Sequence, residues 1–198
     1  MGIGPVRFSI SDALEMVRKG ILPEDSTIEL LDGELIYRDR FDLRGDQIVE
    51  GVKHNYVVAV LGDLRSVINT PERHLRTQST LICADKHAPI PDGIILRGAS
   101  DAYRDRLPTA ADALCVVVEV ADASYERDAG EKLSGYARAG IAQYIIVNLR
   151  NRTAEIYTNP DVVEGTYAAR EVISESGTLA IRVAETEFYQ VPLGNLLP

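Results

Sequence analysis

Apolar residues recur every three to four positions in three segments, and this spacing predicts amphipathic helices. The predicted helices cover residues 8–19, 51–68 and 126–139. Ser11 or Asp12 could cap the first helix, because a short polar side chain accepts a hydrogen bond from the free amides of the first turn. Gly140 directly follows the third helix, at the position where a glycine often ends one.

Shorter apolar runs between these helices predict strands. They cover residues 76–83, 93–96, 114–120, 142–149 and 153–158, with 166–174 and 178–184 as a closing hairpin. In segment 27–37, Asp32-Gly33 lies between two apolar arms, which is a strong signal for a two-residue hairpin turn. The strand, helix, strand order over residues 114–149 predicts a crossover onto one sheet. We therefore expect an α+β fold with one mixed sheet flanked by helices.

Composition narrows the classes of protein. The chain has 198 residues, which suits about one domain, and we expect a single domain over residues 1–198. No apolar run approaches the length of a membrane span, and the first ten residues lack the features of a signal peptide, so we expect a cytoplasmic protein without a membrane contact. Cys83 and Cys115 lie in strand-like segments and are expected to be buried thiols.

The net charge of −9 argues against a protein that holds nucleic acid through bulk positive charge. Any contact with DNA would have to be local. Basic residues with acidic neighbours are Arg38, Arg40, Arg44, Lys53, Arg65, Arg73 and Arg76. Their interleaving with acids predicts weak binding to DNA that depends strongly on salt in the absence of metal.

Three residues are candidates for chemistry. Glu119 lies in the apolar run LCVVVEV, where a carboxylate is costly unless something compensates it; the alternative is a strand-end carboxylate that reaches solvent. Asp92 opens a short strand after Pro91, although Pro-Asp-Gly is also ordinary turn chemistry. Lys132 lies at the edge of the apolar arc of its helix, either paired with Asp128 on the surface or directed over the sheet toward Glu119.

The order of these residues resembles the PD-(D/E)XK nuclease superfamily and, within it, the Uma-type restriction endonuclease family. The matching stretches are IELLDGELI (28–36), the helix with His54, PDGIIL (91–96) and VVVEVADASYERDAGEKLSGYARAGIAQYIIV (116–147). The resemblance covers roughly residues 8–160, and we expect residues 161–198 to form a C-terminal extension rich in strands. The resemblance implies a restriction-endonuclease-like fold.

Two features depart from the usual pattern. The superfamily's lysine normally follows its glutamate by two residues, where this chain has Ala121, and the resemblance moves that role to Lys132. The family usually has Trp and Asp in the last strand, where this chain has Ile145 and Asn148. Neither Ile145 nor Asn148 is expected to be catalytic.

The resemblance implies a metal-dependent endonuclease that hydrolyses phosphodiester bonds of DNA. Asp92, Glu119 and Lys132 would be catalytic. Asp92, Glu119 and the backbone carbonyl of Val120 would hold Mg²⁺, for which Mn²⁺ could substitute, because hard cations prefer oxygen ligands. Two other classes remain open: a binding or assembly module without catalysis on the same scaffold, and a metal-dependent hydrolase of a smaller phosphate ester.

Further residues match the family in order, and they are accessory candidates. Glu29 could be an additional acid or an exposed hairpin residue, and His54 could contact substrate or serve the fold. Tyr136 follows Lys132 by one helical turn. His74 and His87 show no metal-ligand spacing. Apolar strand surface in the C-terminal segment predicts a homodimer.

Overall fold

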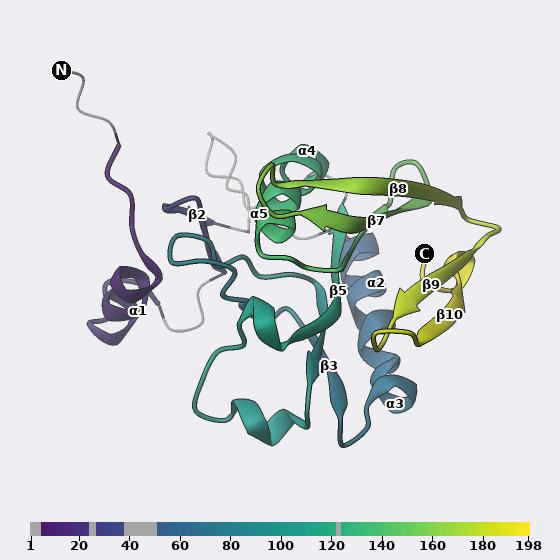
Figure 1. Ribbon diagram of the computed structural model, residues 1–198, viewed down its shortest axis with the longest axis horizontal. Helices are drawn as coiled ribbons and strands as arrows, with labels where there is room; N and C mark the ends of the chain where they lie inside the picture. The colour runs from purple at the N-terminus through teal and green to yellow at the C-terminus, as the bar shows by residue number, and fades with distance from the viewer. Residues whose placement is uncertain (1–4, 24–26, 38–50, 122–123) are drawn as a thin grey trace.

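The computed structural model describes residues 5–23, 27–37, 51–121 and 124–198, without the side chains of residues 115–117. Six strands form the central sheet in the order β3-β4-β5-β6-β7-β8 (Figure 1). They are β3 (Arg73–Thr77), β4 (Gly93–Arg97), β5 (Ala113–Ala121), β6 (Gln143–Asn148), β7 (Thr153–Asp161) and β8 (Thr166–Ser174). Strands β5 and β6 are parallel, as the crossover predicts, and the other neighbouring pairs are antiparallel. The predicted α+β fold with one mixed sheet is confirmed.

Helices and two small hairpins surround this sheet. The helices are α1 (Ile10–Arg18), α2 (Val52–Asp63), α3 (Arg65–Ile68), α4 (Tyr125–Arg127) and α5 (Leu133–Arg138), with a π-helical turn at Asp128–Lys132 and 3-10 turns η1 (Ser100–Tyr103), η2 (Ala110–Asp112) and η4 (Leu193–Asn195). The hairpins are β1 (Ile28–Leu31) with β2 (Glu34–Tyr37) and β9 (Thr178–Arg182) with β10 (Phe188–Pro192). None of the helices in the described residues is long and apolar enough to span a membrane.

Alternation along the strands gives the sheet two apolar faces, each with its own cover. On β6, Ile145 and Val147 pack in a core with α2 and the β9–β10 hairpin. Tyr144 and Ile146, which alternate with them, pack in a second core with Tyr136 of α5. In Figure 1, α2 and α5 accordingly lie on different sides of the central strands. Strand β5 runs between the two cores and carries Glu119 into the α5 side.

Several turns form for the local reasons that the sequence indicates. Asp32 and Gly33 both have positive φ, 43° and 85°, so the predicted two-residue hairpin turn is confirmed. Gly140 has φ 73° and donates to the Ala137 carbonyl, while Ile141 donates to the Tyr136 carbonyl, so the predicted glycine stop is confirmed. The cap of α1 was predicted wrongly: Ser9 is the N-cap, and Asp12 bonds back to it from the third helical position.

Two predicted helices are interrupted. The helix expected over residues 51–68 ends at Asp63, and α3 begins at Arg65 after a break at Leu64. The helix expected over 126–139 contains the π turn between α4 and α5. Regular 3.6-residue spacing does not reveal an extra residue in one turn, because the apolar positions on either side remain periodic.

Two strand predictions were wrong. The strand expected at 76–83 is β3, which ends at Thr77, because Gln78 adopts φ 49° and leaves the extended conformation. The closing hairpin of 166–174 with 178–184 does not form, because β8 pairs with the nine-residue β7 and β9 pairs with β10. Cys83 is a free, half-buried thiol whose pKa is raised by burial, and the Cys115 side chain lies outside the described part of the chain.

Candidate active site

Glu119 lies on β5, and Asp92 directly precedes β4, the neighbouring antiparallel strand. Gly93, the first residue of β4, pairs with Val118, so Asp92 lies beside the part of β5 that carries Glu119. Both are buried. The strand-end alternative for Glu119, in which its carboxylate reaches solvent, is therefore wrong.

Two neighbours fix the Asp92 carboxylate. The backbone amide of Val120 donates to Asp92 Oδ2 over 2.7 Å, and His54 Nε2 from α2 lies 3.2 Å from each carboxylate oxygen. The Asp92 carboxylate therefore contacts the backbone of β5, which lies outside its own Pro-Asp-Gly turn. His54 meets a predicted site residue directly, although the sequence left its role open.

Lys132 is the centre of the cluster on the other side of Glu119. Its ammonium lies 2.7 Å from Glu29 Oε1, 3.1 Å from Glu119 Oε1 and 3.7 Å from Asp128 Oδ1. Its side chain is only 3% exposed, so the alternative of a surface Asp128–Lys132 pair is wrong. The π turn begins at Asp128 and ends at Lys132, and it directs both side chains toward β5.

Tyr136 completes the contacts of Glu119. One turn after Lys132, its hydroxyl donates to Glu119 Oε1 over 2.8 Å. Burial raises the pKa of Tyr136 well above its ordinary value, and the Glu119 carboxylate adds to this effect. The phenol therefore stays protonated and acts as a hydrogen-bond donor.

Glu29 reaches the cluster because its hairpin docks on the segment before β4. Leu30 forms a β-bridge with Ala88, and the Ile90 amide donates to Glu29 Oε1 over 2.7 Å. Glu29 is fully buried, so the alternative of an exposed hairpin residue is wrong. Glu29, which precedes Glu119 by about ninety residues in the sequence, thus supplies another carboxylate to the Lys132 ammonium.

The electrostatics of the cluster are unbalanced. Burial raises the pKa of Glu119 well above its usual range, although the Lys132 charge opposes the shift. Burial also raises the pKa of Asp128. For Lys132, burial alone would lower the pKa, but the facing carboxylates of Glu119 and Glu29 outweigh it and raise the pKa above its ordinary value. The lysine is therefore a permanent cation among more acids than it can neutralise.

The donor set fits a hard divalent cation. Three buried carboxylates lie within 4 Å of the Lys132 ammonium, and two of their oxygens, Glu29 Oε2 and Asp128 Oδ1, have no hydrogen-bond partner in the described residues. Asp92 bonds to the Val120 amide, next to Glu119 on β5, and the two carboxylates could hold such an ion. No three His, Cys, Asp or Glu side chains of the described chain converge into a complete metal site. A cation held here would thus need main-chain oxygen, such as that of Val120, and water to fill its coordination shell.

The six side chains singled out from the sequence come together in this cluster, whereas His74 and Arg73 make their contacts elsewhere. His74 contacts the Gly98 carbonyl, and His87 contacts Asp32 at the hairpin tip. Arg73 pairs with Glu187. Arg38, Arg40 and Arg44 lie outside the described residues.

Arg127 escaped the sequence reasoning, and Asp128 entered it only as a surface partner of Lys132. The buried carboxylate of Asp128 accepts the Ser124 hydroxyl over 2.5 Å, and its backbone carbonyl accepts the Tyr144 hydroxyl over 3.0 Å. Arg127, the preceding residue, lies with Nη1 4.0 Å from Glu29 Oε2. The only available signal was the adjacency of both residues to the Lys132 motif, since burial of either depends on tertiary packing.

Comparison with known proteins identifies the family of the chain and a protein of similar fold. Residues 13–189 match the family model Uma2, which is described as "Putative restriction endonuclease". A crystal structure of a protein from Anabaena variabilis, described as "a putative nuclease belonging to DUF820", superposes with a TM-score of 0.66 at 14% sequence identity and covers 96% of this chain and 97% of that one. A search of curated proteins found no match. At this identity the structural likeness concerns the fold, and it agrees with the predicted fold.

Proposed function

The chain belongs to the Uma2 family, as its motifs predict, and from this premise we propose that it is a divalent-metal-dependent endonuclease that hydrolyses phosphodiester bonds of DNA. The observation that carries the proposal is a buried cluster that holds Asp92 from the residue before β4, Glu119 from β5 and Lys132 from the π turn. The family description and the fold of the Anabaena protein support nuclease chemistry. We propose Mg²⁺ as the ion, with Mn²⁺ able to replace it.

The chemistry that we propose divides the work among these residues. A cation at Asp92, Glu119 and the Val120 carbonyl would lower the pKa of a bound water and neutralise phosphate charge. Val120 N–H and His54 hold the Asp92 carboxylate in place, and Tyr136 and Lys132 do the same for Glu119. Lys132 also supplies the positive charge that opposes the charge accumulating as water adds to phosphorus and the bond to the leaving oxygen breaks.

Amide variants of the two strand carboxylates provide the test. We expect Asp92→Asn and Glu119→Gln each to abolish Mg²⁺-dependent nicking of supercoiled plasmid, because an amide keeps the shape but loses the anionic ligand. Glu171→Gln, at an exposed position on β8, is the matched control and should cleave normally. Calorimetric titration with Mn²⁺ should show binding to the wild type and its loss in both site variants. Normal cleavage by both site variants would refute the assignment.

The remaining parts of the proposal concern the setting of the enzyme. With a net charge of −9, binding to DNA without metal should be weak and should fall steeply as salt increases. We also propose a homodimer, which light scattering would refute by showing only monomer, and a cytoplasmic location. Cutting both strands of a duplex is the chemical task that two copies of such a site would suit.

A further inference from the structure

Buried carboxylates enclose the Lys132 ammonium at the centre of the cluster. Lys132 is 3% exposed and lies within 4 Å of three carboxylates, the nearest at 2.7 Å. An ammonium with three such neighbours has little capacity left to hold the phosphates of an incoming polymer. If the cluster acts on nucleic acid, another cation must meet the substrate where the cluster approaches solvent.

Arg127 occupies that position. Its side chain is 21% exposed, and its Nη1 lies 4.0 Å from the buried oxygen Glu29 Oε2. This distance permits electrostatic attraction but exceeds that of a hydrogen bond. The Arg127 guanidinium donates no hydrogen bond to any residue within the described ranges.

Other arginines of the fold are bound in a different way. Arg106 holds both oxygens of Asp112 at 2.7 and 2.8 Å, and Arg152 holds both oxygens of Glu175 at 2.6 Å. A guanidinium presents five donors in a planar fork that matches a carboxylate or a phosphate. The fork of Arg127 lies partly out of solvent with these donors unused, which is costly unless an anion completes it.

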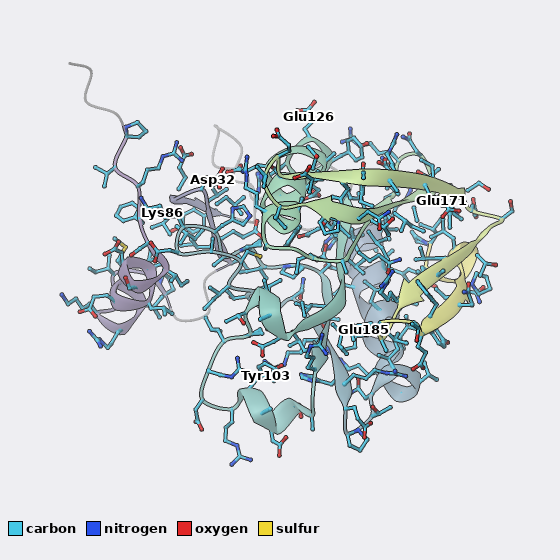
Figure 2. The ribbon with its side chains drawn as sticks, viewed as in Figure 1. Asp32, Lys86, Tyr103, Glu126, Glu171 and Glu185 are labelled. Atoms are coloured by element: carbon cyan, nitrogen blue, oxygen red, sulfur yellow. The ribbon has the colours of Figure 1, made fainter. Side chains whose placement is uncertain are left out.

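The backbone around Arg127 is well anchored. Arg127 ends α4 directly before the π turn, and its amide donates to the Ser124 carbonyl over 2.9 Å. Tyr125, two residues earlier, donates to the buried Glu155 over 2.8 Å. The neighbouring Glu126 projects outward from α4 into solvent (Figure 2). Arg127 is therefore held on a fixed turn, near Glu29 on one side and within reach of solvent.

We propose that Arg127 is a substrate-binding residue that donates hydrogen bonds to a backbone phosphate of the nucleic acid as it enters the cluster. This inference rests on the proposed nuclease function and adds to it the residue that meets the polymer. Glu29 then has two roles: it fixes Lys132 through Oε1, and its other oxygen keeps the Arg127 guanidinium near the site until phosphate displaces it.

The test measures DNA binding separately from cleavage. Fluorescence anisotropy of a labelled DNA duplex in Ca²⁺ would be compared for wild type, Arg127→Ala, Arg127→Lys and the matched control Arg138→Ala, which removes an exposed arginine at the end of α5. We expect Arg127→Ala to weaken binding at least about tenfold and to reduce the slope of log affinity against log salt by about 0.9. Arg127→Lys should keep the slope but not the full affinity, because it keeps the charge and loses the fork.

Two further measurements separate this role from a structural one. In Arg127→Ala, Mn²⁺ affinity and melting temperature should match the wild type, and the effect on Mg²⁺-dependent cleavage should fall on KM more than on kcat. A wild type that cleaves DNA while Arg127→Ala keeps full affinity and slope would overturn this inference alone. Joint loss of metal affinity, melting temperature and DNA binding would also overturn it, in favour of a structural role. A wild type that neither binds nor cleaves DNA would overturn the proposed function as well.

Discussion

Replacing Lys132 by methionine should destabilise the fold strongly. Methionine keeps much of the length and apolar volume of lysine, but it leaves the carboxylates of Glu29, Glu119 and Asp128 buried without their shared cation. Removing one partner of a buried ion pair costs about 3–5 kcal/mol. For a domain of this size, where 1 kcal/mol shifts the melting temperature by roughly 2–4 °C, the expected drop is roughly 6–20 °C.

The assay is urea denaturation of Lys132→Met beside Lys19→Met, whose lysine is 62% exposed at the C-cap of α1. The control should change the free energy of unfolding by less than about 0.5 kcal/mol. Adding Glu29→Gln should recover part of the Lys132→Met loss, because it removes one of the unpaired charges; coupling between residues in contact is about 0.5–3 kcal/mol. The loss should also be smaller at pH 5 than at pH 8, since the native variant takes up protons on its buried acids as pH falls.

Two results would refute this reasoning. A loss below about 1 kcal/mol would mean that the acids are not charged enough to need Lys132. Strictly additive effects of Lys132→Met and Glu29→Gln would mean that the 2.7 Å contact between the two side chains carries no energy.

Three further predictions concern packing and pH. Gly135→Ala should lower the free energy of unfolding by about 1–3 kcal/mol in the same urea assay, because the new Cβ would lie 2.0 Å from Nε2 of the buried His87; an unchanged midpoint would contradict this. Gly130→Ala should raise it by about 0.5–1 kcal/mol, since its Cβ would meet nothing within 4 Å in a helical segment, and a loss would count against the open space at that position. Hydrogen bonds from Arg106 hold the pKa of Asp112 well below its usual range. The stability from this pair is therefore present above pH ~4 and is lost as pH falls further. Between pH 5 and 2 the melting temperature should fall more steeply for wild type than for Asp112→Asn, and parallel curves would refute the assignment.

The parts of the fold that the sequence predicts well are those decided by local chemistry. Asp32-Gly33 forms its turn because both positions need positive φ, and Gly140 ends its helix for a similar reason. The partners of the last strands were not predictable in this way. Several apolar strands could pair with β8, and the choice depends on the length of β7, which continues to Asp161.

In the candidate site, too, the sequence predicts some features and leaves others open. Sequence order was sufficient to group Asp92, Glu119 and Lys132, because the family motif preserves it. It left the direction of Lys132 open, since a regular helical wheel places the lysine at the edge of the apolar arc. The π turn and the burial that turn Lys132 and Asp128 inward arise only when α5 packs on the sheet.

The π turn at Asp128–Lys132 also restricts how the length of this chain can vary. Because the turn holds one residue more than an α-helical turn, deleting any residue within it would rotate the following helix by about 100° relative to Asp128. Either Asp128 would leave Lys132, or Lys132 and Tyr136 would together leave Glu119, so the contacts on the two sides of the turn could not both be kept. The segment should therefore accept substitutions, as at the open Gly130, while it rejects insertions and deletions. Viable relatives that shorten this turn would need a compensating insertion before β6.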